Sequence, residues 1–596
     1  MSDYTPPTLD MIFTITELAD LEAVSSLSVY EESSEELVQA VLDEAGRFFC
    51  NVLAPSNKVG DEQGVLLEGN DVLTPQGFKE AYQQLVDDGW VSLPFPAEEG
   101  GQGLPELVHA AVTEMMQSAN LAFSMCPLLA SGAAAAIRGQ ASPVLKNQYI
   151  PKLASGEWAA AMSLTEPQSG SDLSGIRTKA VSKGDHYLIT GQKIFISWAD
   201  HDMAENIVHL VLARTPGAPI GTRGISLFLV PKYVPEQDGS LGSRNDFSVV
   251  SLEHKLGLHA SPTCAVSYGD NDGAIGYLVG EENQGLAAMF LMMNHSRLQV
   301  ALQGPALVER AYQQALSYAQ ERVQGFAKGY EGQVAIIHHP DVQRMLMTMK
   351  AGTEAMRALS YVTAGQIDQE EYSGNQALRQ EIAARVSLMT PIIKGWCTEF
   401  SQELVQLALQ IHGGMGYVEE TGVAQYMRDA RIMTIYEGTS AIQAMDLVGR
   451  KLLRDNGLTF MSLIKDMRAD IQDSERFDNS MRELIKAFEH AVFRLEESAQ
   501  WILENHAREE VDIGAIAFDF MMLAGVVSGG WQMTRAAVIA TARLSEGVGI
   551  SEFYRQKIAS SLFYAEYLLP RADSYARVVL NGGGSLKECQ FLIASA

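Results

Sequence analysis

Apolar residues recur at spacings of three and four between residues 37 and 153, which places them on one face of successive helices. An example is the set Phe78, Tyr82, Leu85 and Val86. Loops containing Gly and Pro, such as residues 94–105, interrupt the pattern. The pattern therefore predicts an all-helical domain over residues 37–160.

Residues 1–36 are acidic and weakly patterned, and they predict an extension that packs over a neighbouring domain. The uncharged span 115–137 is long enough to cross a bilayer, but it is rich in Ala, Gly and Ser and contains Pro127. A lipid-facing span would carry more Leu, Ile and Val. This span therefore favours one or two buried helices of a bundle, and we expect no transmembrane segment.

Near residue 161 the hydrophobic pattern changes from a helical period to short apolar or alternating runs between Gly, Pro and Asp turns. These runs predict strands at residues 187–197, 207–213, 225–230 and 263–268. They make up a compact β domain over residues 161–280.

A helical period returns at residue 285 and continues to residue 453. Pro340 and Pro391 predict helix starts nearby, and Gly413 to Gly416 predict a turn between two helices, so residues 281–455 are expected to form a bundle. Residues 456–596 add a further helical domain, because one apolar stripe and one long apolar helix, residues 513–534, follow. The stripe consists of Leu484, Phe488, Val492, Leu495, Ala499 and Ile502. The fold class is thus mainly α with a central β domain.

Composition narrows the possible partners. The 596 residues carry a net charge of −29, which argues against nucleic acid, because binding of phosphate requires a basic face. The five cysteines are scattered without a CxxC pair, so neither a disulfide framework nor a zinc site is expected, and a reducing compartment is indicated. The first ten residues show no secretory pattern, and we expect a cytoplasmic location.

Residues 435–442 read Ile-Tyr-Glu-Gly-Thr-Ser-Ala-Ile and carry the clearest candidate chemistry. Glu437 is a potential general base, and Gly438 beside it leaves room for a ligand to approach the backbone. Taken alone, the string has little weight, because an isolated glutamate is far more often a solvated surface residue.

Three further motifs precede it in the chain: Ser-Leu-Thr-Glu-Pro-Gln-Ser-Gly-Ser-Asp at 163–172, Gly-Gln-Lys-Ile-Phe-Ile-Ser at 191–197 and Gln-Ile-His-Gly-Gly-Met-Gly at 410–416. The four motifs, in this order, resemble the acyl-CoA dehydrogenases. The resemblance implies that family's helical, β and helical domains, with the additional helical domain at the end. It also implies FAD as cofactor and Glu437 as the base that removes the α-proton while the β-hydrogen leaves as hydride to the flavin.

The resemblance also assigns contacts residue by residue. It implies FAD contacts by Thr165, Ser171, Phe195, Ser197, Arg322, Gln410, Gly413, Gly414 and Thr439. It implies substrate contacts by Ser171, Asn294, Arg297 and Gly438. Phe195 replaces a frequent tryptophan, and Asn294 replaces a frequent aspartate. His338, His339 and His412 lack the spacing of metal ligands, so we expect no metal. Contacts across a dimer interface in the family imply a homodimer.

The long extensions resemble a bacterial branch that includes 3-methylmercaptopropionyl-CoA dehydrogenases and larger fatty acyl-CoA dehydrogenases. We expect a medium- or long-chain fatty acyl-CoA as substrate in β-oxidation and an electron-transferring flavoprotein as electron acceptor. Three alternatives stay open: a 3-methylmercaptopropionyl-CoA dehydrogenase, an acyl-CoA oxidase that uses O2, and a catalytically silent acyl-CoA binder. Retention of Glu437 argues against the last of these.

Overall fold

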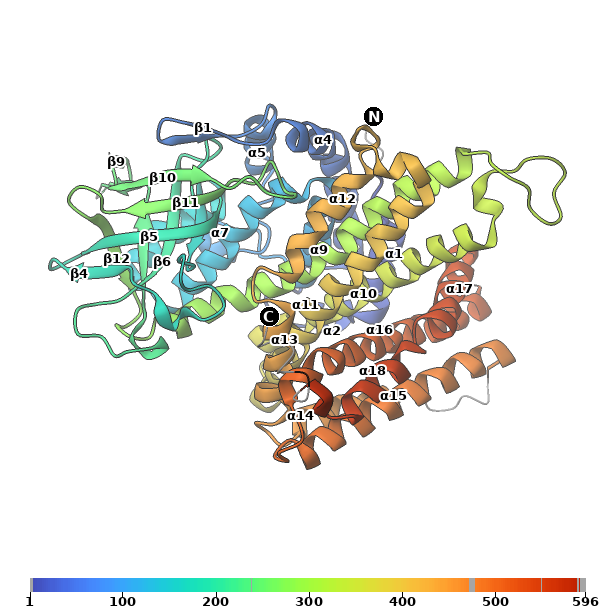
Figure 1. Ribbon diagram of the computed structural model, residues 1–596. Coiled ribbons are helices and arrows are strands. Elements are labelled where there is room, and N and C mark those ends of the chain that lie inside the picture. The colour runs from blue at the N-terminus through green and yellow to red at the C-terminus, as the bar shows by residue number, and fades with distance from the viewer. Residues whose placement is uncertain (1–3, 237, 471–476, 548, 587–588, 590–596) are drawn as a thin grey trace. The chain divides into compact units, whose positions relative to one another are not determined.

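The computed structural model describes residues 4–236, 238–470, 477–547, 549–586 and 589 (Figure 1). The chain divides into two compact units. The first comprises residues 47–104 and 119–299, and the second comprises residues 3–46, 105–118 and 300–596.

The helical part of the first unit surrounds α7, a helix that is buried along most of its length. Its helices are α4 (Ala54–Gln63), α5 (Phe78–Asp87), α7 (Leu121–Gln140) and α8 (Pro143–Ser155). The prediction of an all-helical domain was wrong in one place, because β1 (Leu66–Glu68) and β2 (Asp71–Leu73) form an antiparallel hairpin. Gly69, at φ +63°, supplies the tight reversal that the short apolar pattern did not reveal.

The β part of the first unit is an eight-stranded sheet in the order β10-β11-β5-β12-β7-β6-β3, with β4 paired to β5. All four predicted strands are present. The strands of the sheet are β3 (Trp158–Ser163), β4 (Lys179–Ser182), β5 (Tyr187–Ser197), β6 (Asn206–Ala213), β7 (Ser226–Pro231), β10 (Phe247–Leu252), β11 (Thr263–Tyr268) and β12 (Ala274–Val279). The strand β3 pairs parallel to β6, and its start at Trp158 precedes the expected boundary. A separate pair consists of β8 (Tyr233–Pro235) and β9 (Leu241–Arg244).

The second unit is helical. Its main helices are α6 (Glu106–Ala119), α10 (Pro340–Tyr372), α11 (Gln376–His412), α12 (Val423–Ala430) and α13 (Ser440–Met445), and α9 (Gly285–Glu321) enters it from the first unit. Pro340 begins α10, as predicted. Pro391 lies inside α11, so the predicted helix start near it was wrong. The burial of residues 388–398 around Pro391 outweighs the backbone hydrogen bond that proline cannot donate.

The N-terminal segment belongs to the second unit and contains α1 (Thr8–Phe13), α2 (Leu21–Ser25) and α3 (Glu35–Phe48). Asp10 forms ion pairs with Arg357 of α10, at 2.5 Å, and with Lys557 of α17 (Ser551–Tyr567). Arg357 also pairs with Glu114 at 2.5 Å and with Glu309 at 3.0 Å. One buried cluster of charges thus joins the N-terminal segment to four other helices.

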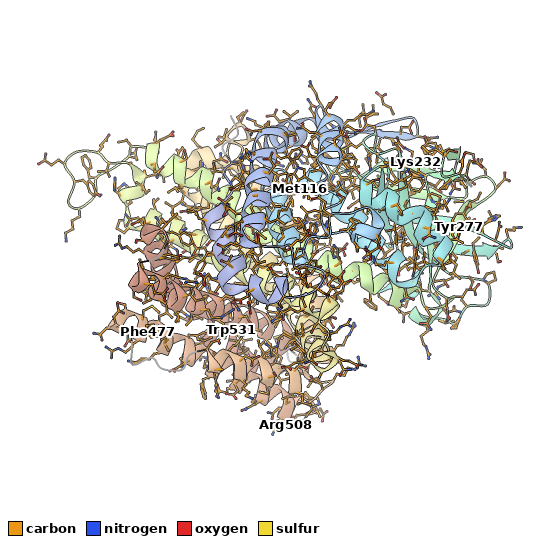
Figure 2. All side chains as sticks on the ribbon, turned by 180° about the vertical axis from the view of Figure 1, so that it is seen from behind. Met116, Lys232, Tyr277, Phe477, Arg508 and Trp531 are labelled. Atoms are coloured by element: carbon orange, nitrogen blue, oxygen red, sulfur yellow. The ribbon has the colours of Figure 1, made fainter. Side chains whose placement is uncertain are left out.

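The last part of the second unit contains α14 (Leu458–Ala469), α15 (Asn479–Asn505), α16 (Ile513–Glu546), α17 and α18 (Arg571–Leu580). The predicted stripe is buried along α15, and the predicted apolar helix is α16. Trp531, which Figure 2 labels, donates from its indole nitrogen to Asp470 at 2.8 Å. By length and composition α7 and α16 could cross a membrane, but 83% and 72% of their most apolar windows are buried within the protein, as in core helices.

Candidate active site

Glu437 lies in a sharp turn between a 3-10 turn, Arg431–Thr434, and α13. Both Glu437, at φ +54°, and Gly438, at φ +89°, have left-handed backbone conformations. This conformation is uncommon for a residue with a side chain, and it is strained unless the surroundings hold it. Thr439 then caps α13 by accepting a hydrogen bond from the Ile442 amide at 3.3 Å. Residues 437–440 are called the glutamate turn below.

Tyr436 fixes the entry to the glutamate turn. Its hydroxyl donates a short hydrogen bond to the side-chain oxygen of Gln303 on α9. Burial raises the pKa of Tyr436 well above its ordinary value, so the phenol is neutral at physiological pH. Glu437 itself is partly buried, and the apolar residues beside it are consistent with a base whose water is displaced when a ligand binds.

A second group of candidate residues lies in the first unit, around Thr165 and β5. The carbonyl of Thr165 accepts a hydrogen bond from the Ile194 amide at 2.9 Å. Lys193, which is fully buried, donates to the Leu164 carbonyl and to Glu166, both at 2.9 Å. Burial disfavours ionised Glu166, but Lys193 and donors from Thr178 and Arg177 outweigh burial and hold its pKa at about 2. This ion pair fixes Thr165 beside β5.

Phe195 is the most unusual residue of β5. The pairing of β5 with β11 shifts in register between Cys264 and Val266, and Phe195 adopts φ +59° at this irregularity. Phe195 is 59% exposed, although the neighbouring Ile196 is buried. Ser197 follows with a partly exposed side chain. The exposed aromatic residue is therefore held on β5, next to Ile194, whose amide bonds to Thr165, and two residues before Ser197.

The remaining candidates of the first unit are placed differently. Ser171 is exposed in a turn that Asp172 stabilises by accepting from the Ser174 amide at 2.8 Å. Arg297 is 6% exposed on α9. Asn294 also lies on α9, but its side chain lies outside the described residues.

In the second unit, Arg322, Gln410, Gly413 and Gly414 lie at or just beyond the C-terminal ends of α9 and α11. The two ends are joined, because Tyr318 stacks on His412 with ring centroids 4.4 Å apart. Gly413 ends α11 at φ +59°. Arg322 and Gln410 are exposed, so this group forms a solvent-facing surface distinct from the glutamate turn.

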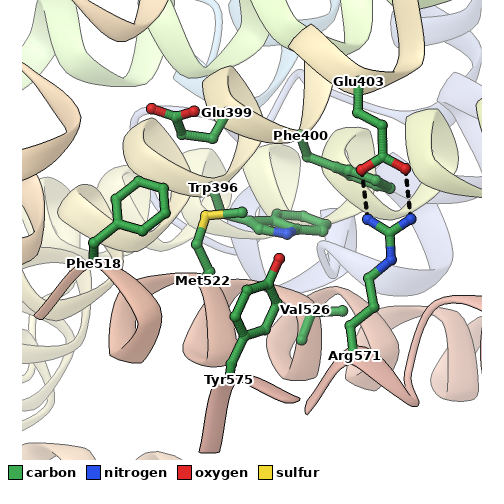
Figure 3. Close-up of a pocket in the computed structure, with 9 residues that line it drawn as sticks. All are labelled: Trp396, Glu399, Phe400, Glu403, Phe518, Met522, Val526, Arg571 and Tyr575. Carbon is green, nitrogen blue, oxygen red and sulfur yellow. Dashed lines mark hydrogen bonds and ion pairs between the residues drawn. The ribbon is translucent and has the colours of Figure 1, made fainter. Parts of the chain in front are cut away.

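A pocket of about 150 Å³ lies within the second unit (Figure 3). Its lining residues are Trp396, Glu399, Phe400, Glu403, Phe518, Met522, Val526, Arg571 and Tyr575. None of the site residues predicted from the sequence lines it. Its Glu399 nevertheless accepts a short hydrogen bond from Ser440 of the glutamate turn.

Sequence reasoning missed Glu399 and also Lys394, which donates to the carbonyl of Gly438 at 2.7 Å. Lys394 is the only charged residue in the segment 386–398, and this isolation among apolar residues was the available signal. A lysine in such a segment is buried only when its ammonium group has partners.

Models of three acyl-CoA dehydrogenase domains match the chain in order: the N-terminal domain at residues 35–157, the middle domain at 161–270 and the C-terminal domain at 283–453. A fourth model, described as acetyl-CoA dehydrogenase C-terminal like, matches residues 463–590. The chain belongs to the acyl-CoA dehydrogenase family.

Relatives of this acyl-CoA dehydrogenase match over almost their whole length. The 3-methylmercaptopropionyl-CoA dehydrogenase of Ruegeria pomeroyi is 44% identical, over 98% of this chain and 99% of its own. The broad-specificity linear acyl-CoA dehydrogenase FadE5 of Mycobacterium tuberculosis is 32% identical, over 97% and 98%. The crystal structure of an acyl-CoA dehydrogenase complexed with FAD from Bacillus anthracis shares the fold, with 22% identity, a TM-score of 0.73 and coverage of 93% and 90%.

The protein is therefore an FAD-dependent oxidoreductase. The residues present fit a flavin, because the exposed ring of Phe195 and the hydroxyl groups near it offer a flat surface with polar partners. At the second group, a Cβ atom added to Gly413 or Gly414 would meet no atom within 4 Å, so backbone there is open to a ligand.

Proposed function

We propose that the protein removes the α- and β-hydrogens of an acyl-CoA thioester and that Glu437 is the general base. The observation that carries this assignment is the conformation of the glutamate turn, where a carboxylate occupies a strained left-handed position next to a glycine. Strain of this kind persists only where the surrounding structure holds it, and strained residues are concentrated at functional sites. The product is the trans-2-enoyl-CoA.

In this proposal Glu437 takes the α-proton, and its carboxylate must become more basic as water leaves the site. The enolate oxygen that develops needs donors placed in advance, and the backbone amide of Glu437 serves as one of them. Gly438 leaves room at that point. FAD supplies the acceptor for the β-hydrogen, which leaves as hydride. The residues that would hold FAD are those implied by the family resemblance: Thr165, Ser171, Phe195, Ser197, Arg322, Gln410, Gly413, Gly414 and Thr439.

We propose 3-methylmercaptopropionyl-CoA as the first candidate substrate. The support is the identity of 44% to a 3-methylmercaptopropionyl-CoA dehydrogenase, over 98% of this chain and 99% of that protein. Ser171, Asn294 and Arg297 would bind the CoA part. Arg297 is a suitable partner for the anionic CoA. Because the chain as a whole carries a net charge of −29, a cation at the site itself must balance the charge of the ligand.

A straight-chain fatty acyl-CoA, expected from the sequence to be of medium or long chain, is the second candidate. The relation to a broad-specificity linear acyl-CoA dehydrogenase favours it. Small and adaptable side chains of α7, including Met125 and Gly132, are packed in the first unit, where Cγ of Met292 lies 3.1 Å from a Cβ added at Gly132. We propose that this region lines the acyl site, and its close packing favours a short tail over a long one.

The test is an anaerobic titration of the purified holoenzyme with 3-methylmercaptopropionyl-CoA and with straight-chain acyl-CoAs of increasing length, followed by flavin absorbance. Bleaching by the thioether substrate at the highest kcat/KM supports the first candidate. A higher kcat/KM for a straight-chain acyl-CoA would instead support the second candidate substrate. A yellow protein that none of these compounds bleaches would contradict the proposed function.

We further propose that an electron-transferring flavoprotein accepts the electrons and that the protein is a homodimer. Reoxidation of the reduced enzyme should be slow in air and fast with that flavoprotein. Fast reoxidation by O2 with release of hydrogen peroxide would instead identify an oxidase. A monomer in sedimentation velocity would contradict the homodimer.

A further inference from the structure

We propose that Lys394 and Glu399, two residues of α11, are positioning residues that hold the glutamate turn in the conformation that aims Glu437. The proposal rests on the assignment of Glu437 as the base. Neither residue needs to touch substrate or cofactor, because both act through the backbone and through Ser440.

Lys394 supports the glutamate turn through two backbone carbonyl groups. Its side chain is fully buried, and its ammonium group donates to the carbonyl of Gly438 at 2.7 Å and to that of Met433 at 2.9 Å. These two carbonyls lie on opposite sides of Glu437 in the chain. A single cation therefore ties the two ends of the segment that carries the base, and charge-assisted hydrogen bonds of this kind are stronger than neutral ones.

Glu399 holds the last residue of the turn. Its carboxylate accepts a short hydrogen bond from the hydroxyl of Ser440, which is the first residue of α13. The same hydroxyl lies 3.4 Å from the Thr434 carbonyl. Lys394 and Glu399 are five residues apart on α11, so one stretch of one helix fixes both the middle and the end of the turn.

The turn needs this support, because two consecutive residues, Glu437 and Gly438, are left-handed. A residue with a Cβ atom rarely adopts this conformation, because the Cβ crowds the backbone. Gln443 adds weaker hydrogen bonds to the carbonyls of Glu437 and Gly438, at 3.2 and 3.3 Å. Without Lys394 and Glu399, the strained backbone can relax and rotate the base away from its working direction.

The same stretch of α11 also packs against α16, so α11 itself cannot move easily. A Cβ atom added to Gly395 would lie 2.1 Å from the sulfur of Met521. Figure 3 shows Trp396 and Glu399 above the α16 residues Met522 and Val526. The additional C-terminal helices thereby hold α11 in place, and α11 in turn supports the glutamate turn.

Substitutions at Glu399 separate positioning from general stability. Glu399→Leu removes the acceptor with little change in volume, and Glu399→Gln keeps an acceptor oxygen for Ser440. We expect the leucine variant to lower kcat by about tenfold or more, because small misplacements of a catalytic group are costly. The glutamine variant should stay within about threefold of wild type, since its neutral hydrogen bond is only moderately weaker.

Glu403→Leu is the matched control. Glu403 lies one turn further along α11, and its carboxylate pairs with Arg571 of α18 at 2.6 Å instead of with Ser440. This variant should keep the wild-type kcat, although it also removes a carboxylate of α11 from the same pocket together with its ion pair to Arg571. Lys394→Met should lower kcat more than Glu399→Leu does, with the affinity for a non-oxidisable thioether analogue of the acyl-CoA changed by less than about threefold, because the loss falls on the chemical step.

Hydrogen exchange gives a reading that does not depend on activity. Glu399→Leu and Lys394→Met should speed amide exchange in residues 435–443 at least about tenfold, whereas Glu403→Leu should leave it unchanged. Unchanged exchange and unchanged kcat in both variants would overturn the positioning role. Faster exchange in a protein that no acyl-CoA reduces would instead uphold the positioning role and contradict the proposed function, so the two failures are distinguishable.

Discussion

Trp396 of α11 and Gly525 of α16 lie in such close contact that a Cβ atom on Gly525 would be 2.1 Å from Cγ of the indole. A Cβ atom added to Gly529, one turn further along α16, would lie 2.7 Å from the same indole ring. These two glycines let the additional C-terminal helices approach the bundle that carries Glu437. A small residue at position 525 is therefore a requirement of the packing.

Gly525→Ala should lower the melting temperature, because the added methyl group must displace Trp396 or separate the two helices. Overpacking of this kind typically costs about 1–3 kcal/mol. Differential scanning calorimetry measures the shift, and Gly449→Ala is the control, since its Cβ would meet no atom within 4 Å. Equal melting temperatures for both variants would show that α16 does not pack on α11 this closely.

Arg357→Met should release the N-terminal segment. The substitution leaves the carboxylates of Asp10, Glu114 and Glu309 without the buried cation that they share. Removal of one partner from a buried ion pair costs about 3–5 kcal/mol. Limited proteolysis should then cut within the first 30 residues, whereas Arg344→Met, which removes an exposed pair on the same helix, should not expose them. Resistance of the Arg357→Met protein would contradict the anchoring role of the cluster.

The buried His209 should make the stability of the β part depend on pH. Burial lowers the pKa of His209 to about 4, and its ring bonds to the Tyr268 hydroxyl at 2.6 Å and to the Ala199 carbonyl at 2.7 Å. Between pH 4 and 6.5 the unfolded chain binds a proton at this histidine and the folded protein does not, so the stability falls as the pH falls through this window. His209→Asn should flatten the plot of melting temperature against pH in that window. An unchanged slope would show that His209 is not the titrating group.

Much of the fold follows from local pattern. The strand β5 was predicted to the residue, and the stripe on α15 was found, because in both cases the period of the apolar residues matches the element that buries them. The hairpin of β1 and β2 was missed, since three-residue strands carry too little pattern. The helix start predicted near Pro391 was wrong, because tertiary packing, which the sequence does not show, outweighs the local effect of the proline.

The candidate site was predicted less completely. The position of Glu437 followed from its motif, but its left-handed backbone and its support by Lys394 depend on residues 43 positions apart in the chain. Likewise, the sequence alone indicates that Glu399 is a surface residue of a helix. Only the structure shows that Ser440 donates a hydrogen bond to it. Contacts of this kind come from tertiary packing, and no local period encodes them.

The most direct test of Glu437 as the base is the rate of flavin reduction when Glu437→Gln and wild-type holoenzyme are mixed anaerobically with 3-methylmercaptopropionyl-CoA or with the best straight-chain substrate. We expect the variant to bind FAD and substrate normally but to be reduced more slowly, by roughly 10²–10⁴-fold, which is the usual contribution of a general base. Glu489→Gln, on the exposed face of α15, should match wild type. Reduction of Glu437→Gln at the wild-type rate would contradict the assignment of the base.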